Sequence, residues 1–155
     1  YFLKNHAFPT SCLGVLLTVA SLFGTSAIGQ EPEQEKQLRM LGRCSGCTFE
    51  QMDLTGRKLT GIDLTEAQLR DVDFSEAGLN LSLFDQATLE NVSFASADLT
   101  GASFTGAKLI NVTFENAVLK AAVFEDAILI DTDLDAGIYC NTQVPDETMV
   151  STECD

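Results

Sequence analysis

The chain has 155 residues, and its formal net charge of −14 comes from 23 acidic and nine basic side chains. Such an excess of negative charge makes nucleic acids and anionic membrane surfaces poor partners. The single histidine is His6. We expect it to leave with a targeting segment, which excludes histidine-based triads, histidine-ligated metals and imidazole acid–base catalysis from the rest of the chain.

Residues 1–29 are predicted to be a signal peptide. Lys4 precedes an apolar run over residues 13–23 that is too short to span a bilayer, and Ala27 and Gly29 place small residues at the positions that a signal peptidase inspects. Because Lys4 is the only charged residue of this segment, residues 30–155 keep 23 acids and eight bases, a net charge of −15. We therefore expect a single exported domain with no stable membrane insertion.

A short capping helix is predicted at the start of this domain, over residues 33–41. Leu38 and Leu41 share one face of it, and Gly42 follows as a stop. We assign residues 30–46 to a linker and this helix.

A strict five-residue repeat follows the capping helix. Nineteen consecutive positions, five residues apart, hold a large apolar side chain, and most are preceded two residues earlier by a small one. The large residues are Phe49, Leu54, Leu59, Leu64, Leu69, Phe74, Leu79, Phe84, Leu89, Phe94, Leu99, Phe104, Leu109, Phe114, Leu119, Phe124, Leu129, Leu134 and Tyr139.

A period of five fits neither ordinary secondary structure. In an α-helix each repeat would rotate the apolar residue about 140° further around the axis, so that no apolar face would form. In one continuous strand an odd period would send successive apolar residues to opposite faces of the sheet. The chain must therefore bend once per repeat.

A second period indicates how many bends close a coil. Val72, Val92 and Val112 are the only valines at the small position, and they lie twenty residues apart. From Leu69 to Leu129 the large residues alternate between Leu and Phe, so a twenty-residue coil stacks like on like. Four repeats per coil predict a four-sided solenoid.

The chain resembles pentapeptide-repeat proteins, whose units follow the pattern A(D/N)LxX, as in residues 97–101 (Ala-Asp-Leu-Thr-Gly). The resemblance covers residues 47–141 and implies an all-β fold, a right-handed quadrilateral β-helix with the central and small residues inward. Arg57 and Ser82 occupy the small position, so we expect strain or local opening of the coil there. The cysteine-bearing flanks are similar to those of exported cyanobacterial and plastid members, which implies a thylakoid lumen or periplasm.

Four cysteines remain after the signal peptide: Cys44, Cys47, Cys140 and Cys154. Coils stacked about 4.8 Å apart give a rod about 23 Å long, whereas a disulfide needs Cα atoms within about 7 Å. This separation favours the local pairs Cys44–Cys47 and Cys140–Cys154 and rejects a zinc site built from all four. We interpret Cys44–Cys47 as a structural staple rather than a redox pair, and residues 142–155 as a C-terminal cap.

No catalytic constellation, cofactor motif or metal loop is recognised in the repeats. Asp71, Asn91, Asn111 and Asp131 form an oxygen-rich corner column, but their spacing is not that of a calcium loop. We expect these side chains to bond one another. The protein is therefore predicted not to be an enzyme and to need no cofactor or metal.

The leading functional hypothesis is an exported, non-catalytic scaffold or interaction module with an unidentified protein partner or a second copy of itself. Outward-facing Ile110, Ile128 and Ile130 form the candidate interaction face, unless the tail folds back and covers them. The alternative is an acidic DNA mimic that binds a type II topoisomerase, as some pentapeptide-repeat proteins do. A redox carrier that works through Cys44 and Cys47 is the third hypothesis.

Overall fold

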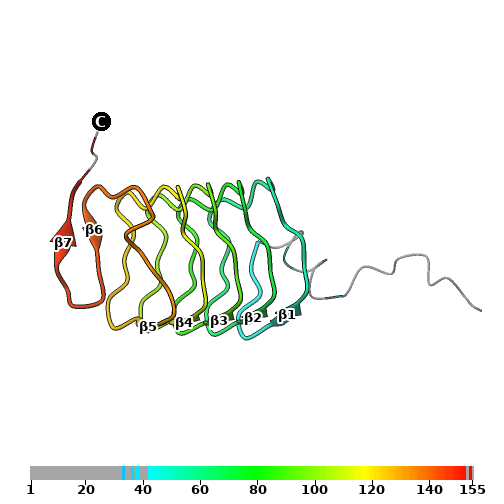
Figure 1. Cartoon of the computed structure of the whole chain (residues 1–155). Coiled ribbons are helices and arrows are strands. Elements are labelled where there is room, and N and C mark those ends of the chain that lie inside the picture. The colour runs from blue at the N-terminus through cyan, green and yellow to red at the C-terminus, as the bar shows by residue number, and fades with distance from the viewer. Residues whose placement is uncertain (1–32, 34–35, 37, 39–41, 153, 155) are drawn as a thin grey trace, which may run out of the picture. The chain divides into compact units, whose positions relative to one another are not determined.

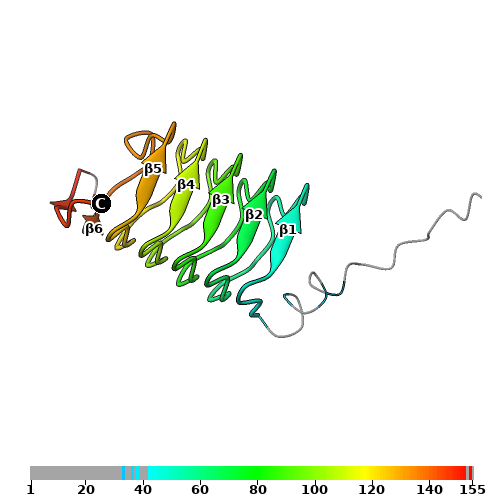
Figure 2. The same cartoon turned by 90° about the horizontal axis from the view of Figure 1, so that it is seen from below.

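A computed structural model describes residues 33, 36, 38, 42–152 and 154; the predicted signal peptide lies outside them. Five parallel strands of three residues each form one sheet in the order β1-β2-β3-β4-β5 (Figures 1 and 2). They are β1 (Thr48–Glu50), β2 (Gln68–Arg70), β3 (Thr88–Glu90), β4 (Lys108–Ile110) and β5 (Ile128–Ile130). Phe49 pairs with Leu69, and Leu69 with Leu89, so one coil takes twenty residues.

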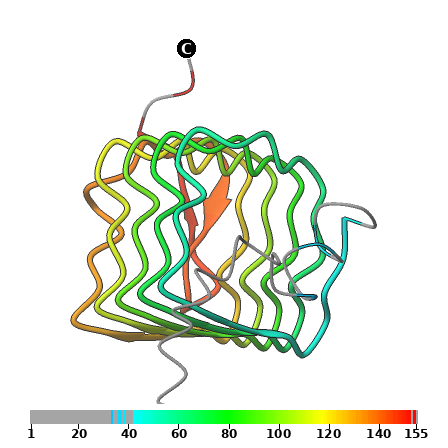
Figure 3. The same ribbon diagram turned by 90° about the vertical axis from the view of Figure 1, so that its right-hand side faces the viewer.

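Three further sides of the coil repeat the same offset. Single bridges join Asp53 to Asp73, Lys58 to Gly78 and Asp63 to Leu83, each twenty residues apart, and equivalent bridges continue to Val123 and Gln143. Seen along the axis, the coils overlie one another as a four-sided outline (Figure 3). The predicted fold class, an all-β quadrilateral β-helix, is confirmed.

From Gly46 to Asp131, every fifth residue has positive φ and turns a corner of the coil. One corner column holds Gln51, Asp71, Asn91, Asn111 and Asp131, whose φ angles lie between 47 and 54°. This left-handed conformation costs a residue with a Cβ atom about 1–2 kcal/mol, and Asn and Asp tolerate it best. A five-residue unit therefore consists of a short extended stretch followed by one sharp turn.

The interior is filled by columns of Leu and Phe on alternate sides. Phe74, Phe94 and Phe114 stack on one side with ring centroids 5.3 Å apart, and Phe84 stacks on Phe104 on the opposite side at 4.8 Å. Rings of the two columns meet edge to face, at 5.5 to 6.2 Å. Edge-to-face and offset stacking are the arrangements that aromatic rings favour.

The coil stays closed at Arg57 and Ser82, so the expected opening is wrong. Ser82 is fully buried, and its hydroxyl donates a 3.2 Å hydrogen bond to the carbonyl oxygen of Leu59. This bond satisfies a polar group that is buried in the interior of the coil. The side chain of Arg57 is exposed, and its backbone N–H still donates to the carbonyl oxygen of Leu54 at 3.2 Å.

The N-terminal end of the solenoid begins at Arg43, which pairs with Asp63, four residues ahead of the predicted start at residue 47. Before it, Glu33, Lys36 and Leu38 have helical backbone, and the other residues of the predicted capping helix lie outside the described set. Leu38 is buried in the core, and the N–H of Gly42 donates to its carbonyl oxygen at 2.8 Å. Positive φ at Gly42, 64°, is typical of a helix C-terminus.

A hairpin lies at the C-terminal end. Strands β6 (Thr142–Gln143) and β7 (Met149–Val150) pair antiparallel, and Gln143 still bridges to Val123 of the coil below. Val144 and Val150 pack against the core, and the two strands are seen across the far end of the solenoid in Figure 3. The hairpin thus shields part of the last coil.

Replacing Phe94 by Ala should lower the free energy of unfolding by about 3–5 kcal/mol, because the ring is completely buried between two stacked neighbours. Leu54→Ala, in the first coil, should lower it less, since Leu54 is 6% exposed. Urea or thermal unfolding of both variants measures the difference. Equal or reversed losses would contradict a core stacked in columns.

Candidate functional site

The three isoleucines predicted as an interaction face lie on the outer surface of β4 and β5. Ile110 ends β4 and is half-buried, whereas Ile128 and Ile130 of β5 are 56% and 40% exposed. Ile110 pairs in register with Ile130. The alternative, that the tail covers these side chains, is wrong for the tail residues described, because Ile128 and Ile130 remain exposed in the presence of β6 and β7.

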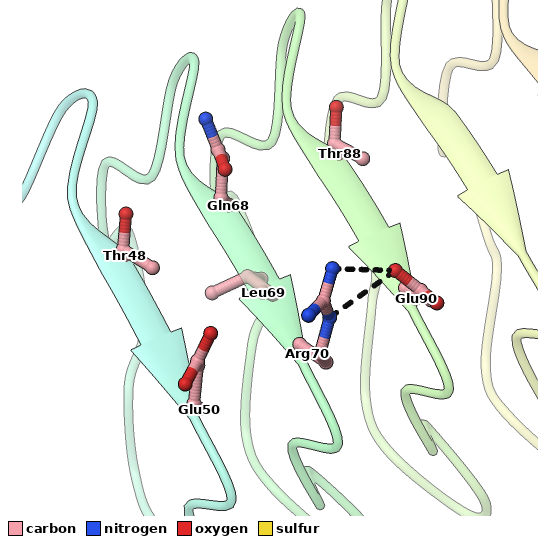
Figure 4. A pocket seen from close by; sticks show the side chains of 7 residues that line it. All are labelled: Thr48, Glu50, Gln68, Leu69, Arg70, Thr88 and Glu90. Atoms are coloured by element: carbon pink, nitrogen blue, oxygen red, sulfur yellow. Dashed lines mark hydrogen bonds and ion pairs between the residues drawn. The ribbon is translucent and has the colours of Figure 1, made fainter.

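The N-terminal half of the same sheet face is polar. Thr48, Glu50, Gln68, Arg70, Thr88 and Glu90 surround a hollow of about 50 Å³ over β1, β2 and β3 (Figure 4). A guanidinium nitrogen of Arg70 lies 3.2 Å from a carboxylate oxygen of Glu90. Charges on this half therefore offset one another, and the hollow is too small for a drug-sized ligand.

Charge is distributed unevenly along the chain. Residues 121–155, which include the last coil and the hairpin, contain nine acidic residues and no Lys or Arg. Strand β5, with Ile128 and Ile130, therefore lies in the most negative part of the chain, whereas Ile110 shares β4 with the exposed base Lys108.

Three more exposed apolar side chains were missed by the sequence analysis. Leu81 is 63%, Leu83 38% and Met149 58% exposed. Leu81 turns a corner with φ of 60°, and Leu83 lies on the side of the coil that carries the Asp63 bridge. A leucine at an outward position of the repeat is the signal that would have found the first two.

The oxygen-rich corner column bonds to itself, as predicted. The side-chain amide of Asn91 donates to Asp71 at 2.9 Å, and that of Asn111 donates to Asn91 at 2.8 Å. Among the described residues there is no group of three or more His, Cys, Asp or Glu side chains suited to hold a metal ion. The column stabilises the corner rather than presenting a set of ligands.

A comparison with family models decides the family. The model for pentapeptide repeats matches residues 43–80, 79–116 and 97–135, in eight copies. The chain belongs to the pentapeptide-repeat family. A comparison with curated protein sequences found no match.

Solved structures of other pentapeptide-repeat proteins resemble this one. HetL from the cyanobacterium Nostoc sp. strain PCC 7120, involved in heterocyst differentiation regulation, is 29% identical over 70% of this chain, with a TM-score of 0.66. This chain spans 51% of HetL. A protein of the Arabidopsis thaliana thylakoid lumen is also 29% identical, over 67% of this chain and 68% of its own, with a TM-score of 0.48. QnrB1, a plasmid-mediated fluoroquinolone resistance protein, is 17% identical over 66% of this chain and 65% of its own, with a TM-score of 0.38.

The four described cysteines of this pentapeptide-repeat protein lie in the two local pairs that the sequence predicts. The Cα atoms of Cys44 and Cys47 are 5.4 Å apart, and those of Cys140 and Cys154 are 4.9 Å apart. Cys44 is 1% exposed and stands five residues before Phe49, so it takes an inward position of the repeat. The first pair closes the N-terminal coil, and the second ties the end of the chain to the last coil.

Tyr139 ends the inward series with a buried polar group. The side chain is 4% exposed, and its hydroxyl has no hydrogen-bond partner among the described residues. Burial raises the pKa of this hydroxyl well above its usual range, and the carboxylates of Asp135 and Asp133 add to the effect. The phenol therefore stays neutral near neutral pH, and no hydrogen bond from the described residues offsets the burial of its hydroxyl. Among the described residues, no helix is both long enough and apolar enough to cross a membrane.

Non-reducing peptide mapping should recover Cys140 joined to Cys154, and Cys44 joined to Cys47. The Cys140–Cys154 bond closes a loop of about 15 residues, so the double variant Cys140→Ser/Cys154→Ser should lose about 3 kcal/mol in the chain-entropy model. As a control, reduction should destabilise this variant less than the parent. Recovery of Cys44 or Cys47 joined to Cys140 or Cys154 within one molecule would contradict a rod of stacked coils that separates the two pairs.

The variant Tyr139→Phe should be more stable than the parent by about 1 kcal/mol at neutral pH, because it removes a buried hydroxyl without a partner. The difference should widen in alkali. The folded-state pKa of Tyr139 is raised, so the parent's stability is fully present below about pH 10, where the unfolded phenol is neutral, and falls as the pH rises above it. Melting temperatures of the parent and the variant at pH 7, 9 and 11 test this prediction. The same difference between the two proteins at all three pH values would contradict it.

Proposed function

We propose that this protein is an exported, non-catalytic interaction module of the thylakoid lumen or periplasm. The observation that carries the proposal is the exposed pair Ile128 and Ile130 beside Ile110, on a rigid and completely filled solenoid. Exposed apolar patches rimmed by polar residues mark binding sites. HetL is involved in the regulation of heterocyst differentiation, and a regulatory role of that kind is one that a binding protein fulfils.

Export is supported by the signal-like segment over residues 1–29 and by the two local cysteine pairs, because disulfides persist in oxidising compartments. Subcellular fractionation with N-terminal sequencing tests it. We expect a mature N-terminus at Gln30 in the exported fraction. A full-length protein in the cytosol would overturn this part of the proposal.

The two other hypotheses fit the geometry less well. A DNA mimic needs an evenly anionic surface. Here Arg70 pairs with Glu90 on the flat face, and the negative charge is concentrated in the last 35 residues, which contain no base. A redox carrier needs an accessible thiolate, whereas Cys44 is 1% exposed. We therefore retain the interaction module as the proposed function.

The double variant Ile110→Glu/Ile130→Glu should abolish partner capture or self-association while leaving the melting temperature nearly unchanged, because both side chains face outward. Co-precipitation from the native compartment and size-exclusion chromatography measure the two outcomes. The matched control is Thr48→Glu/Thr88→Glu, which adds the same charge to the polar half of the same face. Unaltered binding by the isoleucine variant would rule out this face as the interface.

A further inference from the structure

Strand β5 is the open edge of the five-stranded sheet. The N–H of Ile128 donates to Ala107, and the carbonyl oxygen of Ile130 accepts from Asn111, both at 2.9 Å. Because successive residues of a strand direct their backbone groups to opposite sides, the N–H and C=O of Leu129 point away from β4. Among the described residues no further strand pairs with β5. An unpaired donor and acceptor thus remain available at Leu129.

The side chains of β5 are also incompletely covered. Leu69, Leu89 and Leu109, which precede Leu129 in the same inward column, are 0 to 2% exposed. Leu129 is only partly buried, because no coil lies over it on this side. Ile128 and Ile130 stand exposed on the outer face. A strand added here would find apolar surface on both of its faces.

Acidic residues flank this edge at both ends. Asp126 and Asp131 turn the corners before and after β5 and are exposed. Residues 121–155 contain no base, and the neighbouring strand β4 contributes one, Lys108, which pairs with Ile128 on the side away from the open edge. An added strand with basic residues on either side of an apolar centre would therefore be attracted in either direction of pairing.

The same charges disfavour a second copy of this chain as the occupant. If two β5 edges paired antiparallel, Asp126 of one copy would lie near Asp131 of the partner copy, at both ends of the ladder. Like charges placed opposite one another in a sheet are destabilising. The net charge of −14 on each chain adds repulsion.

We propose that β5 binds an extended segment of a partner protein as a sixth strand, and that this segment has three apolar residues flanked by Lys or Arg. The inference rests on the proposed interaction function and names the chemistry of its partner. Main-chain hydrogen bonds to Leu129 hold the segment, its central side chain covers Leu129, and its neighbours continue the columns of Ile128 and Ile130. Its basic flanks meet Asp126 and Asp131.

The test uses the chain with both disulfides and a fluorescent seven-residue peptide, acetyl-Lys-Lys-Ile-Leu-Ile-Lys-Lys-amide. Fluorescence anisotropy should show saturable binding that weakens with added salt. The same peptide with Glu in place of every Lys should not bind. In hydrogen exchange, the basic peptide should slow exchange of the Leu129 amide.

Two matched pairs of variants separate the backbone and charge contributions. Leu129→Pro removes the outward N–H and should abolish binding, whereas Leu129→Ala, which keeps it, should retain part of the affinity. Asp126→Asn/Asp131→Asn should weaken binding about tenfold, from two partly screened ion pairs. Asp53→Asn/Asp98→Asn removes two charges elsewhere on the coil and should change binding less than about twofold.

Equal binding of the acidic peptide, an unprotected Leu129 amide, or a dimer held through β5 in size-exclusion chromatography would each overturn the inference. A different result would contradict the proposed interaction function. Ile110 lies one strand inside the edge, so Ile110→Glu should disturb a partner on the outer face and leave peptide addition at β5 nearly unchanged. Loss of native partner capture in Ile110→Glu, with an unprotected Leu129 amide, would retain the interaction face and reject strand addition.

Discussion

The sharp turn at every fifth residue is the constraint on which the whole structure depends. A chain that enters a left-handed conformation after each short extended stretch changes direction four times in twenty residues and returns above its starting point. Backbone groups then pair between coils, and the central and small residues of each unit have no place except the interior. The ladder, the Phe columns and the corner hydrogen bonds all follow from the turn.

Uniform coils leave the outward residues as the means by which one part of the rod differs from another. In the first three coils, the flat sheet carries Thr, Gln, Glu and Arg, whose charges are partly paired. In the last two coils it carries Ile110, Ile128 and Ile130 together with one base, Lys108, and residues 121–155, which include Ile128 and Ile130, have acids and no bases. A rigid support holds these side chains at fixed spacing, so binding would require little ordering of the protein itself.

The two ends of the solenoid differ in how far their unpaired strand edges are covered. At the N-terminal end, Leu38 and the buried Cys44 fill inward space, and the Cys44–Cys47 pair closes the first coil. At the C-terminal end, the β6–β7 hairpin shields only part of the last coil, and β5 stays unpaired among the described residues. Repeat arrays need such caps because open edges recruit other chains. The proposed strand addition would use the end of the solenoid that is incompletely capped.

The sequence by itself determined the coil, because a five-residue period, with valines twenty residues apart, permits only a chain that bends four times per turn. It also identified the inward residues, the local cysteine pairs and the outward position of the three isoleucines. Only the tertiary structure decided whether these isoleucines are open, since that depends on the path of an aperiodic tail. It likewise decided that Ser82 closes rather than opens the coil, because its hydroxyl reaches Leu59, 23 residues earlier in the chain but one coil below in space.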